Sequence, residues 1–327
     1  MKLKTDLQAD AVLVLTTIIW GSTFPLSKDI LDHWPPVAYL VMRMGVSAAL
    51  MALLFRRQLA RAGRAEWRAG ATLGLLLSVG MTGLIVGQVY TTAARSAFIA
   101  GLTTPLVPFV AYLLTRARPG LENLLGVVLA SAGGMLILAP QGEAGAGAAN
   151  AGDFLTLGCT VFFAAHLTLM SVYARRHDVR ALTVIQIATV WAVLTVYWMA
   201  LLTGGALGGT DGLPLAVARE FQPLAWTGGV LWRFAYMVVV ATVLNFLLWT
   251  WAQGRMSATH AAIIFSLEPV FATLFAVWMR GAGEWTGGRA NFGAALILAG
   301  IIVSELRWGG RGGYWGTRMG RIRTDEH

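Results

Sequence analysis

The chain has 327 residues, of which 57% are hydrophobic and 13% are charged, whereas soluble domains average about 45–50% and about 25%. This composition favours an integral membrane protein over a soluble domain. The formal net charge of +9 does not indicate nucleic-acid binding, because the basic residues form short clusters between apolar runs instead of one continuous face. The single cysteine, Cys159, excludes a disulfide framework and a multi-cysteine metal site.

Ten segments approach the length of about 20 mostly apolar residues that a membrane-spanning helix needs. In chain order they are Ala11–Ser27, Val37–Phe55, Ala69–Tyr90, Ala97–Thr115, Leu121–Ala139, Phe154–Ala174, Ala181–Leu202, Phe234–Trp251, Ala258–Met279 and Ala290–Leu306. The connections are short except for a Gly- and Ala-rich link over 141–152 and the longer loop Gly204–Ala225. The positively charged N-terminus is followed by no small-residue cleavage site, so we expect the first helix to be retained. The expected fold class is an all-α integral membrane protein with ten transmembrane helices.

Positive charges set the expected orientation, because cytoplasmic loops carry an excess of Lys and Arg. With the N-terminus inside, 18 basic residues fall in inside segments and 6 in outside segments. We therefore expect both termini to be cytoplasmic.

Internal comparison predicts two related halves. The matching positions occur at offsets of 143 to 167 residues, and they are Asp10 with Asp153, Arg43 with Gln186, Pro105 with Pro269, Gly126 with Gly293 and Gly133 with Gly300. Because each half has an odd number of helices, the second half enters the membrane from the opposite side, and substrate is expected to bind near the midplane. The expected organisation is a first five-helix repeat over 1–140, a flexible link over 141–152, a second repeat over 153–306 and a basic cytoplasmic tail over 307–327.

Several short motifs occur in the order seen in a known family. They are WGSTFPLSK at Trp20–Lys28, Arg43 after a Pro-Pro start, Pro105 in the fourth helix, SLEPVFA at Ser266–Ala272 and GAALILAG at 293–300. The chain resembles the EamA family of the drug/metabolite transporter superfamily over nearly its whole length. The resemblance implies a ten-helix carrier of the bacterial inner membrane, commonly an exporter of amino acids or other small metabolites.

Glu268 and Pro269 lie side by side in the middle of the ninth predicted helix, where a charge and a helix-breaking residue are both costly. Glu268 could bind a substrate ammonium or carry a proton. Alternatively, it accepts hydrogen bonds near the break and holds the helix in shape. The matching pair in the first half, Thr104 and Pro105, has the break without the charge. The feature common to both halves is therefore the break.

Arg43 and His166 are further buried candidates with two open readings each. Arg43 could meet a substrate carboxylate with its planar fork, or it could pair with a helix-end carbonyl or with a carboxylate such as Glu268. His166 could sense pH or stack on substrate, or it could be a satisfied structural residue. At the position that matches Arg43, Gln186 retains a polar group without the charge.

Proline-broken helices are expected to line the pathway, because a freed carbonyl is tolerated in a membrane only where it faces protein or water. The predicted breaks are Pro25, Pro105 and Pro269. The predicted substrate pathway consists of Thr23, Arg43, Gln88, Thr103, Thr104, His166, Gln186, Asn245, Trp249, Ser266 and Glu268. For Gln88 and Asn245, hydrogen bonding between helices is the alternative.

An aromatic wall for an apolar or aromatic substrate is a further possibility. Its candidate members are Trp20, Tyr90, Trp191, Trp249 and Trp251. Contact with lipid or simple packing is the alternative, because aromatic residues are enriched near membrane interfaces.

The leading interpretation is a secondary or facilitative carrier that exports amino acids by alternating access, with aromatic or large neutral ones expected. Broad-specificity drug or metabolite efflux is the alternative, and a channel or sensor is the alternative of another class. No catalytic, metal-binding or nucleotide-binding motif is present in the sequence, so we expect no enzyme activity, no metal and no cofactor. The expected partners are a small-molecule substrate and the lipid bilayer, without nucleic acid. The sequence leaves the oligomeric state open, and a monomer is compatible with it.

Overall fold

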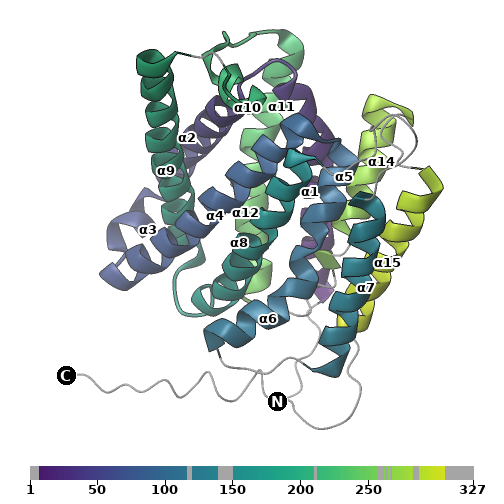
Figure 1. Cartoon of the computed structure of the whole chain (residues 1–327). Coiled ribbons are helices and arrows are strands. Elements are labelled where there is room, and N and C mark those ends of the chain that lie inside the picture. Colours follow the sequence, from purple (N-terminus) through teal and green to yellow (C-terminus); the bar gives the residue numbers. More distant parts are fainter. Residues whose placement is uncertain are drawn as a thin grey trace.

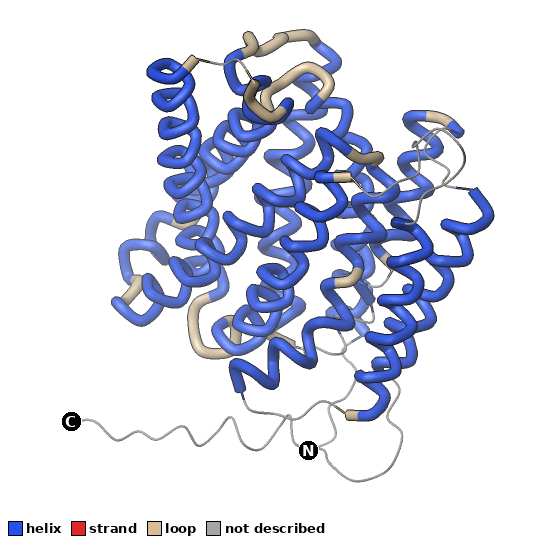
Figure 2. Tube along the Cα trace, in the orientation of Figure 1, coloured by secondary structure: helices blue, strands red, loops and turns tan. Residues whose placement is uncertain are grey.

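The structure is a computed structural model that describes residues 7–115, 120–138, 150–209, 212–255, 261, 264–265, 267–282 and 287–305. All regular secondary structure in these residues is helical (Figure 1 and Figure 2). Seven of the described helical segments are long and apolar enough to cross a membrane. The chain is therefore an all-helical, multi-pass membrane protein.

The helices follow the predicted segments in chain order. They are α1 (Leu7–Leu31), α2 (Pro36–Leu54), α3 (Arg56–Arg61), α4 (Arg64–Tyr90), α5 (Ala93–Gly101), α6 (Thr103–Thr115), α7 (Leu121–Leu138), α8 (Ala151–Tyr173), α9 (Val179–Gly208), α10 (Leu215–Ala218), the 3₁₀ turn η1 (Arg219–Phe221), α11 (Gly228–Val238), the π-helical turn η2 (Val239–Leu244), α12 (Asn245–Gln253), α14 (Glu268–Arg280) and α15 (Gly287–Glu305). The short helices α3 and α10 and the turns η1 and η2 were not predicted.

Local capping explains where several helices start. Pro36 is the first residue of α2, a position at which proline leaves no helical hydrogen bond unmade. Thr92 accepts a hydrogen bond from the Arg95 N–H ahead of α5, and Asp178 accepts from the first N–H groups of α9. Asn150 and Asp153 form a capping box at the start of α8.

The fourth predicted helix is two helices, because α5 ends at Gly101 and α6 begins at Thr103. The break lies just before Pro105, which is the third residue of α6. Glu268 and Pro269 are likewise the first two residues of α14. Both prolines thus occupy a first helical turn, where the missing N–H would have had no helical partner.

The predicted break at Pro25 is absent, because α1 continues without interruption through this residue to Leu31. The helix packs closely against α14 at this level. A Cβ added at Gly21 would lie 2.6 Å from the Cβ of Phe271 and 3.0 Å from the backbone nitrogen of Ala272 on α14. The backbones of α1 and α14 therefore approach closely one turn before Pro25, as small residues permit between membrane helices.

Helices from the first and second halves of the chain pack on each other. α1 packs on α14 and α12, whereas α8 packs on α6 and α4, and α7 packs on α15. A Cβ added at Gly133 would lie 2.3 Å from the carbonyl oxygen of Gly293, and one added at Gly300 would lie 2.5 Å from that of Gly126. α7 and α15 therefore run antiparallel and touch at all four of the glycines that the sequence comparison had paired.

One end of the bundle, at the top of Figure 1, carries α10 and the ends of α1 and α11, and we call it the upper end. The loop between α9 and α11 is tied down there. The indole Nε1–H of Trp34 donates to the Ala225 carbonyl at 2.8 Å. The Glu220 carboxylate accepts from the N–H groups of Val37 at 2.6 Å and Ala38 at 3.1 Å. Glu220 thus caps α2 from a distant part of the chain.

Candidate functional site

A cavity lies inside the bundle between α1, α2, α4, α8, α12 and the helix breaks at α5–α6 and α14. Its polar lining residues are Thr23, Ser27, Arg43, Gln88, Thr103, Thr104, His166 and Glu268. The other lining residues are apolar, aromatic or small. A mostly apolar cavity with a few converging polar groups is the usual form of a small-molecule site.

The cavity brings together eight of the residues predicted for the substrate pathway. They are Thr23, Arg43, Gln88, Thr103, Thr104, His166, Trp249 and Glu268. Gln186 and Asn245 are fully buried but do not line the cavity. Ser266 lies outside the described residues.

The two helix breaks meet in the cavity wall. A Cβ added at Gly101, the last residue of α5, would lie 2.9 Å from the Cγ of Pro269. The first turns of α6 and α14 place Thr103, Thr104 and Glu268 on the cavity. Irregular backbone is thus buried in protein beside a cavity, which is where a membrane protein tolerates it.

Arg43 is buried, with 4% of its surface exposed, and it is held by hydroxyl groups. Its Nε–H donates to Thr242 Oγ1 at 2.9 Å, and Nη1 donates to the Tyr39 hydroxyl at 3.3 Å. In the described part of the chain, no carboxylate pairs with Arg43. The predicted structural partners, a helix-end carbonyl or Glu268, are therefore replaced by two hydroxyl groups from α2 and η2.

Thr242 is a site residue that the sequence did not reveal. It lies on η2, where the helix widens by one residue and the Thr242 hydroxyl donates to the Met237 carbonyl five residues earlier at 2.7 Å. Such π-helical turns occur mostly as single insertions in α-helices, frequently at functional sites. Only the chain's three-dimensional path shows that this turn faces Arg43.

His166 and Gln186 form a buried pair at the cavity wall. His166 Nε2 and Gln186 Oε1 are 3.0 Å apart, and the His166 ring lies 5.3 Å from the Trp249 ring. Gln186, which does not line the cavity, thus fixes the orientation of the His166 ring through this contact. Asn245 also acts between helices, because its side-chain amide donates to the Thr16 carbonyl on α1 at 3.2 Å.

Four rings from α1, α12 and the segment before α14 form an aromatic cluster, which consists of Trp20, Phe246, Trp249 and Phe265. The Trp20 ring centroid lies 5.0 Å from Trp249, 5.5 Å from Phe265 and 5.6 Å from Phe246. These separations are those of favourable aromatic pairs. The cluster provides a large apolar surface on one side of the cavity.

The other aromatic candidates lie away from this cluster. The Tyr90 hydroxyl accepts from the Ala216 N–H in the upper loop at 2.9 Å. Trp191 is 43% exposed. The Trp251 ring lies 3.9 Å from the guanidinium carbon of Arg255. Only Trp20 and Trp249 of the five predicted residues therefore contribute to the cavity.

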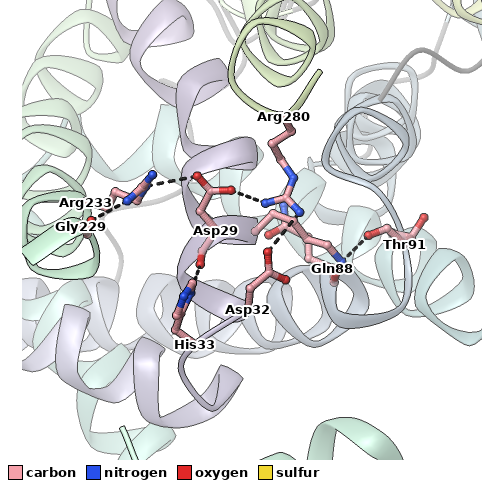
Figure 3. Close-up of polar contacts among 9 residues, drawn as sticks. Asp29, Asp32, His33, Gln88, Thr91, Gly229, Arg233 and Arg280 are labelled. Atoms are coloured by element: carbon pink, nitrogen blue, oxygen red, sulfur yellow. Dashed lines mark hydrogen bonds and ion pairs between the residues drawn. The ribbon is translucent and has the colours of Figure 1, made fainter. Parts of the chain in front are cut away.

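Charged residues join three helices at the upper end of the bundle (Figure 3). We call Asp29, Asp32, Arg233 and Arg280 the upper ion cluster. Asp29 on α1 pairs with Arg280 on α14 and with Arg233 on α11, the latter at 3.2 Å. Asp32 pairs with Arg280 at 3.1 Å. α1, α11 and α14 are therefore tied together above the cavity.

A second group of polar contacts lies on the neighbouring side of the upper end. Lys28 donates from Nζ to the carbonyls of Gln88 and Thr91, the latter at 2.8 Å. Arg95 on α5 pairs with Asp153 on α8 at 2.9 Å, and the Thr91 hydroxyl donates to Asp153 at 2.9 Å. The ends of α1, α4, α5 and α8 are thus connected to one another.

Within the described ranges, no group of three or more His, Cys, Asp or Glu side chains is arranged to hold a metal ion. The site's chemistry therefore resides in one buried guanidinium, one carboxylate, several hydroxyl and amide groups, and aromatic rings.

A cavity of this kind within a multi-pass helical bundle is typical of a membrane transporter. A sequence model of the EamA-like transporter family matches residues 7–139 and 150–306. The chain belongs to this family, so it is a membrane transporter and not an enzyme.

Relatives of known name support this assignment. The chain is 30% identical to an uncharacterized transporter of Archaeoglobus fulgidus over 92% of this chain and 87% of the relative. It is 24% identical to a probable terminal-alkyne amino-acid exporter of Streptantibioticus cattleyicolor, over 91% and 94% of the two chains. It is 25% identical to a probable amino-acid metabolite efflux pump of Salmonella typhimurium, over 89% and 92%.

A solved crystal structure shares the fold. It matches with a TM-score of 0.63 at 17% sequence identity, over 91% of this chain and 96% of the other.

Proposed function

We propose that this protein is a secondary or facilitative carrier that exports amino acids with aromatic or large neutral side chains. The observation that carries this proposal is the combination of Arg43, Glu268 and the aromatic cluster around one buried cavity. The names of the two exporter and efflux relatives point to amino-acid substrates as well.

Each part of an amino acid has a complementary group in the cavity. A guanidinium binds a carboxylate through two parallel hydrogen bonds, and Arg43 has no carboxylate partner among the described residues. Glu268 supplies a negative charge for the substrate ammonium. The aromatic cluster supplies apolar surface for the side chain. Arg43, Glu268 and the cluster are therefore assigned to the carboxylate, ammonium and side-chain subsites.

The proposed transport mechanism is alternating access by two inverted repeats, over 1–140 and 153–306, joined by the link 141–152. The antiparallel contact of α7 with α15 through matching glycines supports this organisation. So do the equivalent breaks before α6 and α14 and the two stretches matched by the family model. Inverted repeats around a midplane site are a recurrent basis of alternating access.

The upper ion cluster is assigned to the gate on one side of this mechanism. It joins α1, α11 and α14, which must separate for substrate to leave the cavity at the upper end. With both termini cytoplasmic in a bacterial inner membrane, the upper end faces the periplasm. Breaking the cluster would then accompany release of the exported amino acid.

Broad-specificity efflux is the second candidate, because an aromatic cluster also suits many apolar compounds. The two candidates differ in their need for Arg43 and Glu268. An amino acid requires both charges, whereas an uncharged drug requires neither. A channel or sensor, the candidate of another class, would not exchange substrate one for one.

The test is counterflow in proteoliposomes loaded with unlabelled L-phenylalanine and supplied with a trace of labelled L-phenylalanine. The proposal predicts transient, saturable accumulation of label. It predicts at least a tenfold loss in Arg43→Lys, because lysine keeps the charge but loses the fork, and little change in Arg57→Lys, since Arg57 is exposed on α3. Unchanged counterflow in Arg43→Lys, or passive equilibration without accumulation, would contradict the proposal.

Proton coupling of this transport is tested through Glu268. If Glu268 carries a proton, Glu268→Gln abolishes the dependence of counterflow on pH. If Glu268→Gln retains full transport with an unchanged pH profile, Glu268 neither carries a proton nor binds the ammonium.

A further inference from the structure

The hydrogen bonds of Arg43 have a fixed direction. A guanidinium only donates hydrogen bonds, so the Thr242 oxygen accepts from Nε–H at 2.9 Å. The single proton of the Thr242 hydroxyl is committed to the Met237 carbonyl at 2.7 Å. Thr242 therefore has one hydrogen-bonding role toward Arg43, which is that of an acceptor at Nε.

The π-helical turn makes this arrangement possible. In an α-helix, a threonine hydroxyl usually bonds the carbonyl three or four residues earlier, as Thr250 does with Phe246 on α12. On η2 the hydroxyl of Thr242 instead reaches the carbonyl five residues earlier. The wider turn places its oxygen against α2, where Thr242 is fully buried.

A second acceptor fixes the other edge of the guanidinium. The Tyr39 hydroxyl accepts from Nη1 at 3.3 Å and lies 3.3 Å from Ser27 Oγ. A guanidinium has five N–H groups, and these two bonds leave three, one on Nη1 and two on Nη2. Among the described residues, the Nη1–Nη2 end is the edge on which both nitrogens keep an N–H group without a partner, and this end can bind a carboxylate through two parallel bonds.

We propose that Thr242, on its π-helical turn, is a positioning residue that aims the Nη1–Nη2 end of Arg43 at the carboxylate of the transported substrate. The inference rests on the proposed function and adds the group that sets specificity for a carboxylate. Without the acceptor at Nε, the guanidinium rotates about its long side chain. The two substrate bonds then cannot form together.

A purely structural role for Thr242 predicts a different result. If the contact with Thr242 only joined α2 to η2, its loss would lower the stability of the fold and weaken transport of all substrates alike. If Thr242 aims Arg43, its loss weakens binding of substrates that carry a carboxylate and spares those that do not.

The test uses Thr242→Val, which keeps the shape of the side chain and removes the hydroxyl, and compares L-phenylalanine with L-phenylalanine amide in counterflow. The half-saturation concentration for the amino acid is expected to rise about tenfold, equivalent to one substrate hydrogen bond to a charged group. The value for the amide is expected to change by less than about twofold. Thr242→Ser, which keeps the hydroxyl, is expected to have the same ratio of half-saturation concentrations, amino acid to amide, as the parent protein.

Thr168→Val is the matched control, because the Thr168 hydroxyl is buried and, among the described residues, bonds only the Ala164 carbonyl of its own helix at 2.8 Å. Its ratio of amino acid to amide should equal that of the parent. Should Thr242→Val fail to accumulate in membranes, Thr242→Ala removes the same acceptor with less bulk and takes the same test. Adding Thr242→Val or Thr242→Ala to Arg43→Lys should leave the ratio of half-saturation concentrations, amino acid to amide, as it is in Arg43→Lys alone.

An equal change for both compounds in Thr242→Val, or no change for either, would overturn the role of Thr242. Absence of counterflow for both compounds in the parent protein would instead overturn the proposed function.

Discussion

The upper end of the cavity and its aromatic side are held by different kinds of contact made by the same helix. At the upper end of α1, Asp29 and Asp32 pair with Arg233 and Arg280 on other helices. Nine residues earlier, roughly 13 Å along the helix at 1.5 Å per residue, Trp20 packs among the rings of the aromatic cluster.

Ionic and aromatic contacts respond differently to water and salt. Ion pairs depend on both partners being close, and salt weakens them where they are partly exposed. Aromatic packing depends on contact area and ring geometry and has no paired charges for salt to screen. In the proposed mechanism, the upper ion cluster opens and closes the cavity, and the aromatic cluster contacts the substrate side chain.

The largest expected effect comes from the aromatic side. Trp249→Ala removes a side chain that is 4% exposed and packs on three other rings and His166. Replacing a buried Phe or Trp by Ala costs about 3–5 kcal/mol. Thermal unfolding in detergent should show a large drop in midpoint that is the same at low and high salt. The control is Trp278→Ala, at a side chain that is 79% exposed, for which a change within about 0.5 kcal/mol is expected. If the drop in unfolding midpoint of Trp249→Ala depended on salt, the distinction between ionic and aromatic contacts would be contradicted.

A smaller effect is expected from breaking the upper ion cluster. Asp29→Asn removes the charge that two arginines share. Ser27→Cys, which lies on the cavity wall just below the cluster, should then react about tenfold faster with a polyethylene glycol maleimide, a shift of roughly 1.4 kcal/mol toward the open form. The only native cysteine, Cys159, is buried and gives a low background. Asp178→Asn is the control, because asparagine caps a helix as well as aspartate does. Equal reaction rates with and without Asp29 would show that the cluster does not close the cavity.

Salt should reproduce part of this effect. Raising ionic strength from about 0.1 M to 1 M shortens the screening length from about 10 Å to 3 Å. Reaction of Ser27→Cys with the uncharged reagent in detergent should rise roughly two- to threefold, because Asp29 and Arg280 are partly exposed. The same change in salt should have little effect once Asp29→Asn is present. Equal salt sensitivity with and without Asp29→Asn would show that salt does not act through the upper ion cluster.

The smallest expected effect is a pH dependence from the upper loop. Burial raises the pKa of Glu220, while the N–H groups of Val37 and Ala38 and the charge of Arg219 act in the opposite direction. Because its pKa in the folded protein is above the ordinary value, the contribution of Glu220 to stability is fully present below about pH 4 and is lost as pH rises through the raised pKa. The midpoint of thermal unfolding should therefore fall as pH rises through the raised pKa. Glu220→Gln should flatten that slope. An identical slope in both proteins would contradict this assignment.

Much of the helical architecture could be read from the sequence, because apolar length and local signals set it. The break before Pro105, the matching position of Pro269, and the glycines of α7 and α15 were all visible as spacing. The error at Pro25 has a physical cause. A proline removes only one helical hydrogen bond, and α1 continues through Pro25 where it packs closely on α14 at Gly21.

The partners of the charged residues could not be predicted, since they come from distant parts of the chain. Thr242 follows Arg43 by 199 residues, and a π-helical turn has no established sequence signal. The same holds for Glu220, which caps α2 from 183 residues away. The sequence could nominate Arg43 as buried and functional, but only the structure shows which edge of it is free.

Alternating access is tested most directly by measuring both ends of the cavity together. Ser27→Cys reports the upper end, and Gln253→Cys, at a buried residue where α12 ends away from the upper end, reports the opposite side; each is measured in the parent and in Asp29→Asn. The account predicts that Asp29→Asn speeds the reaction of Ser27→Cys and slows that of Gln253→Cys, because one side closes as the other opens. Faster reaction at both positions, as a continuous channel would give, would contradict it.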